Sequence, residues 1–313
     1  MKSIIKQSNK KAAFTIVELL VVMSIIMILM GILLPAFNAA KRYARKVRQT
    51  AQFKSIDVGL ELYRNEFEGY PPSDGEDTAG TYNNYPGAMK LAEAMMGQDL
   101  LGFHPSSLFK KEGKDAAGSD LYFRCDPPPQ PPTPPYLENM RTRKGPYLQL
   151  ENANPYSLLE LYGEGKFGNL GDTRCDPNGG IVLCDEYKRV RSSTTGKRLG
   201  SPILYYTADV SSTLHDDTSL TTARQSIYNV TDNQELIDLG IVWDPASGYV
   251  HPMASSGTDH NGDTASWKKF YAITRDEKVG VIPRPKMVDS YILISAGYDG
   301  LYGTKDDVFN FGD

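Results

Sequence analysis

The sequence contains few of the residues that usually form metal centres or catalytic sites. Its 313 residues include three cysteines and four histidines, and no histidine has zinc-ligand spacing to a cysteine. The chain contains no HExxH metal motif, no GxSxG nucleophile motif and no Walker phosphate-binding loop. These absences favour a structural or binding protein, and we therefore expect no enzymatic activity.

The three cysteines allow at most one intrachain disulfide. Cys175 and Cys184 bracket a glycine-rich turn, whereas Cys125 stands apart. The sequence alone permits any of the three single pairings. If the body of the protein lies in an oxidising periplasm, Cys175–Cys184 is the pairing that we expect.

Basic residues are outnumbered by acidic ones in most of the chain. Residues 1–64 contain eleven Lys and Arg against three Asp and Glu, which gives a net charge of +8. The remaining residues contain 23 basic and 35 acidic side chains, which gives −12. An acidic body repels phosphate groups, so nucleic acid is not an expected partner. The basic stretch 41–48 would instead attract the anionic headgroups of membrane lipids.

One long apolar segment dominates the N-terminal region. Between Glu18 and Lys41 there is no charged side chain, and the uncharged run Leu19–Ala40 comprises 22 residues. As a helix this run is about 33 Å long, which is enough to cross the hydrocarbon core of a bilayer. No A-x-A cleavage pattern follows the run, as it would in an ordinary secretory signal, and the small residues Ala12 and Ala13 precede it instead.

The segment Lys10–Pro35, KKAAFTIVELLVVMSIIMILMGILLP, resembles the leader of type IV pilins and type II secretion pseudopilins. This resemblance implies that a prepilin peptidase cuts between Ala13 and Phe14, on the cytoplasmic side, and methylates the new amine of Phe14. Residues 1–13 are then the leader. Ala13 departs from the glycine that usually precedes the cut.

Glu18 is a lone carboxylate within the apolar helix. Such a charge costs about 2.5–3.5 kcal/mol on insertion scales, so it needs a partner. The nearest candidate is the new amine of Phe14, above all that of a neighbouring subunit, and this ion pair would set the axial register of stacked helices. A charge tolerated near the end of a signal anchor is the alternative. By the resemblance, Glu18 is the acidic fifth mature residue and Pro35 the proline that kinks the helix.

The resemblance also implies a single-pass inner-membrane protein with its N-terminus in the cytoplasm. Positive residues do not decide this orientation, because four precede the apolar run and five follow it closely.

The helix is expected to continue beyond the membrane. A set of apolar residues recurs at spacings of 3, 4, 3 and 4, which places them on one helix face: Phe53, Ile56, Leu60, Tyr63 and Phe67. We predict one helix from residue 14 to about 67. Residues 14–40 are its membrane and polymerisation part, and 41–68 are its amphipathic continuation. The alternative is a signal anchor followed by a separate helix.

Residues 69–313 are predicted to form a periplasmic globular α+β domain. A short helix is expected at 86–96, and the proline-rich segment 126–136 should form an extended loop. Four β-rich runs follow, at 180–184, 202–207, 278–282 and 290–295. Few helical patterns separate them, so we expect a small antiparallel sheet that packs against the apolar helix face.

The C-terminal segment 295–313 is an acidic, glycine-rich loop. Asp299, Asp306 and Asp307 could surround one hard cation, although their spacing is not that of an EF-hand. A solvated acidic turn is the alternative. The segment also resembles the calcium-binding loop of the major, G-class pseudopilins. This resemblance implies calcium ligands from Asp299, from Asp306 or Asp307, and from the backbone carbonyl of Leu301.

These patterns together predict a pseudopilin, a filament subunit of a type II secretion system. The resemblance implies assembly with further copies and with minor pseudopilins, and contacts with the prepilin peptidase, the inner-membrane secretion platform and membrane lipid. The periplasmic filament would push folded proteins through an outer-membrane channel. A minor type IV pilin for adhesion, motility or DNA uptake is one alternative. A membrane-anchored binding or enzymatic domain is another.

Overall fold

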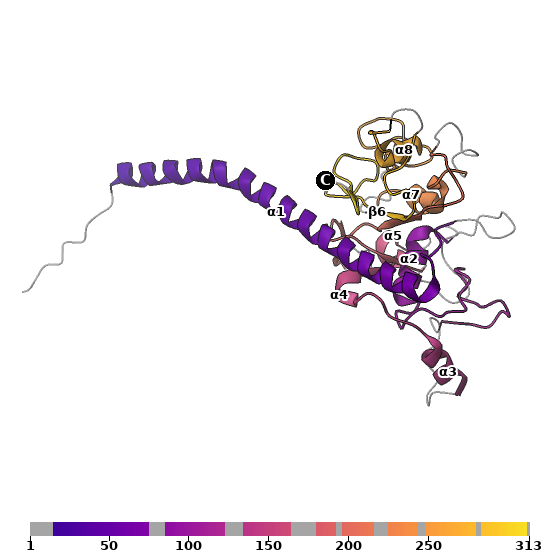
Figure 1. Ribbon diagram of the computed structural model, residues 1–313. Helices are drawn as coiled ribbons and strands as arrows, with labels where there is room; N and C mark the ends of the chain where they lie inside the picture. The colour runs from indigo at the N-terminus through magenta and orange to yellow at the C-terminus, as the bar shows by residue number, and fades with distance from the viewer. Residues whose placement is uncertain are drawn as a thin grey trace, which may run out of the picture. The chain divides into compact units, whose positions relative to one another are not determined.

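The computed structural model describes residues 15–74, 85–122, 134–163, 180–191, 196–215, 225–242, 248–279 and 283–311. The chain divides into two compact units, residues 1–44 and residues 45–313. We call the second unit the head. Helix α1 runs through both units, and Figure 1 shows it as one continuous helix.

The described elements follow one another in the order α1 (Ile16–Phe67), α2 (Gly87–Met96), α3 (Pro134–Thr142), α4 (Leu150–Ala153), β1 (Pro155–Ser157), α5 (Leu158–Tyr162), β2 (Ile181–Leu183), β3 (Val190–Arg191), β4 (Arg198–Leu199), β5 (Leu204–Thr207), the 3₁₀ helix η2 (Val230–Asn233), α7 (Gln234–Asp238), α8 (Lys268–Thr274), β6 (Tyr291–Ser295) and β7 (Val308–Phe309).

Helix α1 confirms the prediction of one uninterrupted helix. It begins at Ile16 and ends at Phe67, where Glu68 adopts a left-handed backbone conformation with φ of 61°. The helix continues through Pro35, whose missing N–H would have bonded to the carbonyl of Gly31. The predicted alternative of two separate helices is therefore wrong.

The second half of α1 packs on the head through the predicted apolar stripe. Phe53, Ile56, Leu60 and Tyr63 are at most 5% exposed, and Phe67 packs at the edge of the same cluster. Two buried glutamines extend this face, since both Gln49 and Gln52 are at most 4% exposed.

A three-stranded antiparallel sheet forms the centre of the head. Its order is β5-β6-β7, with Leu204 opposite Ile294 and Ile294 opposite Phe309. Alternate residues of β5 and β6 face opposite sides because successive strand side chains point in opposite directions. Tyr205 and Leu293 belong to the apolar cluster that includes α1.

The other face of the sheet carries a second apolar cluster. Leu204, Tyr206 and Ile292 pack there with residues of α7 and α8. Figure 1 shows β6 with α7 and α8 on one side and α2 with the second half of α1 on the other. The head is thus an α+β structure, as the sequence predicts.

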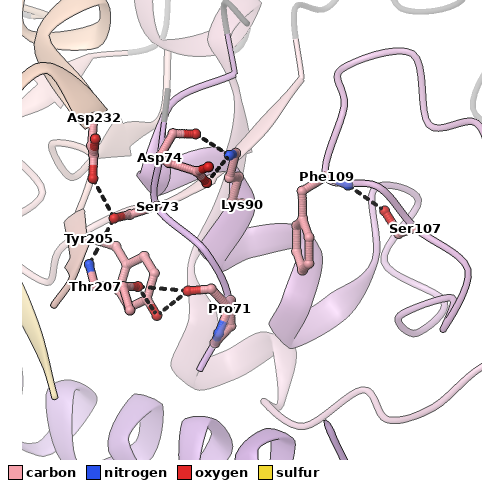
Figure 2. A network of polar contacts seen from close by, with 9 residues as sticks. All are labelled: Pro71, Ser73, Asp74, Lys90, Ser107, Phe109, Tyr205, Thr207 and Asp232. Carbon is pink, nitrogen blue, oxygen red and sulfur yellow. Dashed lines mark hydrogen bonds and ion pairs between the residues drawn. The ribbon is translucent and has the colours of Figure 1, made fainter. Parts of the chain in front are cut away.

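Helix α2 packs on β2 and β5 and belongs in part to the apolar cluster that includes α1, and all ten of its residues are buried. Its buried Lys90 forms an ion pair with Asp74 over 3.1 Å. Figure 2 shows the contacts of the segment that follows α1. Ser73 of this segment donates a hydrogen bond to Asp232 and accepts one from the backbone N–H of Thr207. These contacts anchor the chain on β5 as it leaves α1.

Three predictions about the head need correction. The run 180–184 contains β2, but β2 pairs with β1 and lies outside the central sheet. Residues 278 and 279 are in no strand, and 280–282 lie outside the described residues. Residues 134–136 belong to α3 rather than to an extended loop, because proline fits the first turn of a helix, where N–H groups have no helical partner.

Candidate functional site

The first turn of α1 positions the carboxylate of Glu18. Thr15 precedes the helix, and its hydroxyl accepts a hydrogen bond of 3.2 Å from the backbone N–H of Glu18. In return, Glu18 Oε2 accepts the backbone N–H of Thr15 over 2.9 Å and its hydroxyl over 2.8 Å. This reciprocal arrangement is a capping box, which satisfies two N–H groups that a helix start leaves unpaired.

The predicted cleavage and methylation residues, Ala13 and Phe14, lie outside the described residues. They precede the capping box directly in the chain. Sequence analysis overlooked the role of Thr15, although the spacing Thr-x-x-Glu before an apolar run is a recognised signal for a helix start.

The first half of α1 has an uncovered apolar surface. Large apolar side chains from Ile16 to Phe37 are exposed, including Ile16 at 84% and Ile32 at 71%. Among the described residues, α1 is the one helix whose length and composition suit a membrane span. Burying such a surface is strongly favourable, at about 25 cal/mol per Å² of apolar area, so this segment needs lipid or other helices around it.

The C-terminal loop brings the three predicted aspartates together. The backbone N–H of Asp299 donates to Asp306 Oδ2 and the N–H of Leu301 donates to Asp299 Oδ1, each over 2.8 Å. The N–H of Gly303 donates to Asp307 Oδ2 over 2.8 Å. Each carboxylate therefore folds back onto the loop backbone.

Gly297 permits this tight fold. Its φ is 63°, and an added Cβ would lie 2.1 Å from the carbonyl oxygen of Asp306. Residues with side chains avoid both that conformation and that contact.

The loop crowds negative charge into a partly buried space. Burial, followed by repulsion from Asp299 and Asp306, raises the pKa of Asp307 well above its ordinary value. Burial and the hydrogen bond with Asp306 raise the pKa of Asp299 to about 6. Burial alone would raise the pKa of Asp306, but hydrogen bonds from Asp299 and Thr304 outweigh it and lower that pKa.

The loop matches a cation site in part. Asp307 Oδ1 is buried without a hydrogen-bond partner, which is the kind of oxygen that a cation would satisfy. Among the described residues, the carbonyl of Leu301 is seen to accept a long hydrogen bond, 3.3 Å, from the Thr304 hydroxyl. On the other hand, no group of three Asp, Glu, His or Cys side chains within the described ranges is already arranged to hold a metal ion. The donor types fit calcium, and the geometry would have to tighten around the ion.

The predicted disulfide is not tested by the structure. Cys184 is buried, and this burial raises the pKa of its thiol well above the ordinary value. Cys175 and Cys125 lie outside the described residues, so Cys175–Cys184 stays a prediction.

A family model for the prokaryotic N-terminal methylation motif matches residues 8–34. The N-terminal region is type IV pilin-like. The matched residues span the predicted cut, Glu18 and most of the apolar run, but they are less than a tenth of the chain. No curated protein and no solved structure is significantly similar to the chain.

The pilin-like motif relates the exposed apolar surface of α1 to processing and assembly. It implies processing by a prepilin peptidase and assembly into pilus-like polymers. Both events need an apolar helix that is accessible to lipid and to other subunits, and the first half of α1 is such a helix.

Proposed function

We propose that the chain is a pseudopilin, a filament subunit of a type II secretion system rather than an enzyme. The observation that carries this proposal is the methylation motif on a helix whose first half has an exposed apolar surface. After cleavage before Phe14, the subunit waits in the inner membrane with its head in the periplasm. It then leaves the lipid and packs α1 against the helices of earlier subunits.

Glu18 supports this assembly mechanism because of its position and its remaining bonding capacity. The capping box uses Oε2, whereas no hydrogen bond to Oε1 from the described residues is seen. Oε1 can therefore accept the methylated amine of Phe14 from a neighbouring copy while the helix start stays intact. An ion pair of this kind removes most of the cost of a carboxylate in an apolar surrounding.

The acidic C-terminal loop favours a secretion pseudopilin over a pilin. We propose that calcium binds there through Asp299, Asp306, Asp307 and the carbonyl of Leu301. The partnerless Oδ1 of Asp307 and the mutual repulsion of the carboxylates support this assignment. A bound divalent cation would supply the positive charge that these groups lack and would hold the loop closed.

The processing and assembly steps can be tested by mass spectrometry and by the amount of sheared filament. The wild-type chain should begin at N-methylated Phe14, and Ala13→Leu should retain the 13-residue leader of residues 1–13. Glu18→Ala should be processed normally but should form no filaments and export no protein. Ser24→Ala is the matched control, because Ser24 lies in the same exposed helix and bonds only to the carbonyl of Val21.

A wild-type chain that still starts at Met1, or a Glu18→Ala variant that assembles and secretes normally, would contradict the proposal. Deletion of the gene separates the secretion role from that of a minor type IV pilin. Loss of exported proteins supports the pseudopilin, whereas loss of surface motility or DNA uptake with normal export supports the pilin.

A further inference from the structure

A groove in the head lies between α1 and the last strand of the central sheet. Its volume is about 510 Å³. One wall is the flank of α1 from Lys46 to Asp57, which corresponds to about 16 Å of helix. The opposite wall is the segment Asp307–Phe311, which includes β7. A groove of this length accommodates about five residues of extended chain.

The β7 wall offers backbone groups for pairing. Strand β7 is the last in the order β5-β6-β7, and no described strand pairs with its outer edge. The side chain of Asn310 prolongs the pairing on the inner edge, because it accepts the N–H of Leu293 and donates to the carbonyl of Tyr291. An unpaired strand edge is a ready template for another extended segment.

The groove has an apolar base with a cationic rim. Phe53 and Val308 are buried at its base, and the rings of Phe309 and Phe311 are stacked with their centroids 4.9 Å apart. Three lysines line the groove: Lys46, Lys54 and Lys286.

The carboxylates of the groove already have internal contacts. Asp57 accepts a hydrogen bond from Tyr291 over 2.9 Å and lies 3.4 Å from the ammonium of Lys54. Asp307 accepts from the backbone of Gly303. Lys54 remains 72% exposed, so its ammonium faces solvent and can contact a second carboxylate. The rim is therefore suited to an acidic segment.

A second copy of the chain can provide an acidic segment for the groove. The head, residues 45–313, contains 28 basic and 37 acidic side chains, a net charge of −9, so neighbouring heads present an excess of acidic side chains to one another. A cationic groove is not complementary to itself. A groove on one copy that takes a different, acidic surface of the next makes a head-to-tail contact, which propagates as an open filament rather than closing as a dimer.

We infer that this groove receives an acidic segment from the head of a second copy of the chain. The inference rests on the proposed filament function and adds to it a second contact, made by heads rather than by apolar helices. In that contact, Lys54 and Lys286 pair with carboxylates of the incoming segment, and Phe309 and Phe311 cover its apolar atoms.

Carbodiimide cross-linking tests the contact in the full chain. The reagent joins an ammonium and a carboxylate by an amide bond only where the two groups touch. Two differently tagged copies are co-expressed in cells that assemble filaments, one tag is captured, and the linked peptides are identified by mass spectrometry. The wild-type chain should give dimers linked from Lys54 or Lys286 to an Asp or Glu of the other copy.

In the variant Lys54→Gln with Lys286→Gln the links from these positions should disappear, because glutamine has no amine to couple. The yield of dimers linked through other residues should fall about fivefold, since two exposed ion pairs change an equilibrium by roughly that factor. The matched control is Lys144→Gln with Lys278→Gln, which removes the same charge from exposed positions outside the groove. This control should leave the yield unchanged, and thermal melting should show that both variants are folded.

Three results would overturn the inference: an unchanged yield in the groove variant, links confined to carboxylates of the same copy, or links to another protein. The proposed function has its own readout. If filaments form in a manner that depends on Glu18 while the groove lysines give no links between copies, only the head contact fails. If the leader is not removed and no filaments form, the proposed function fails.

Discussion

Asp185 is a fully buried carboxyl group that joins three segments of the head. Its Oδ1 accepts the backbone N–H groups of Tyr187 and Ser201, over 3.2 and 3.1 Å, and its Oδ2 accepts the hydroxyl of Ser295 over 2.9 Å. The neighbouring Glu186 donates its N–H to Gln49 of α1. A single acid thus connects the end of β6 with the turn that holds α1.

Burial raises the pKa of Asp185 to about 7, against 3.8 for a free side chain, although its hydrogen bonds act in the opposite direction. Between these two values the folded protein binds a proton that the unfolded chain does not. The contribution of Asp185 to the free energy of unfolding is therefore fully present below pH 4 and is lost as the pH rises to 7. His251 has the opposite effect, because burial lowers its pKa to about 4, so its contribution is lost as the pH falls from 6.5.

Replacing this acid by its neutral isostere should stabilise the head at neutral and higher pH. Asp185→Asn keeps both acceptor contacts of Oδ1 and can donate to Ser295. The difference in unfolding free energy between variant and wild type should rise from near zero at pH 4 to roughly 2–4 kcal/mol at pH 8. Urea unfolding at several pH values measures it, and a difference that does not change with pH would refute the assignment.

At the scale of elements, α1 and α2 approach each other closely at Gly59. A Cβ on Gly59 would lie 2.8 Å from the sulfur of Met95 and 3.3 Å from the carbonyl oxygen of Tyr147. Leu60 of α1 and Met95 of α2, which lie at this contact, are both fully buried. A glycine is required here by packing, because its backbone is helical and needs no left-handed conformation.

A large side chain at this contact should separate the two helices. We expect Gly59→Leu to lower the unfolding free energy of the head by about 1–3 kcal/mol through overpacking. Gly31→Leu is the control in the same helix, since no atom lies within 4 Å of a Cβ placed there. It should leave head stability unchanged in denaturant titrations of the detergent-solubilised chain. Equal losses in the two variants would show that the close contact at Gly59 is not responsible, since leucine favours a helix more than glycine does.

Helix α1 could be predicted from the sequence because its signals are long and regular. The uncharged run and the stripe from Phe53 to Phe67 repeat over many turns, and the structure follows them. The short elements carry weaker signals. Strand β7 has two residues, and β1 and β2 have three each, so neither alternation nor length could identify their partners. Pairing between distant segments decides their place.

The candidate sites differ in the same way: local sequence patterns indicate some of them, and others depend on contacts between distant residues. Glu18 stood out as a lone charge in an apolar helix, and the loop aspartates stood out by their spacing. The cationic groove combines residues separated by more than 200 positions, Lys54 and Lys286, and no local pattern could join them. Asp185 was overlooked for a similar reason, because its burial depends on α1, β6 and the turn between β2 and β3 meeting at one point.

At the scale of the whole molecule, the C-terminal loop should couple metal binding to the stability of the head. Calcium at about 100 times its dissociation constant stabilises a folded protein by about 2.7 kcal/mol. For a domain of this size we expect the melting temperature to rise by about 5 °C or more. Scanning calorimetry of the full chain in detergent, with calcium and then with EDTA, measures this shift.

Asp299→Ala should abolish the calcium-dependent shift. Magnesium at the same concentration is the control, because it demands near-ideal octahedral geometry and gives up its water ligands reluctantly. The same melting temperature with calcium and with EDTA would remove the metal from the proposed function and leave the loop as an acidic turn.

The exposed apolar half of α1 determines where a subunit can be stored. Lipid hydrocarbon tails and the surfaces of packed apolar helices are almost equally apolar. Exchanging one surrounding for the other therefore changes the free energy little along most of the helix. In the proposed filament, the difference is concentrated at the carboxylate of Glu18, which would gain a cationic neighbour from an adjacent copy. Under the proposed function, the bilayer would act as a reservoir from which subunits are withdrawn and to which they return, and this one ion pair would favour the filament.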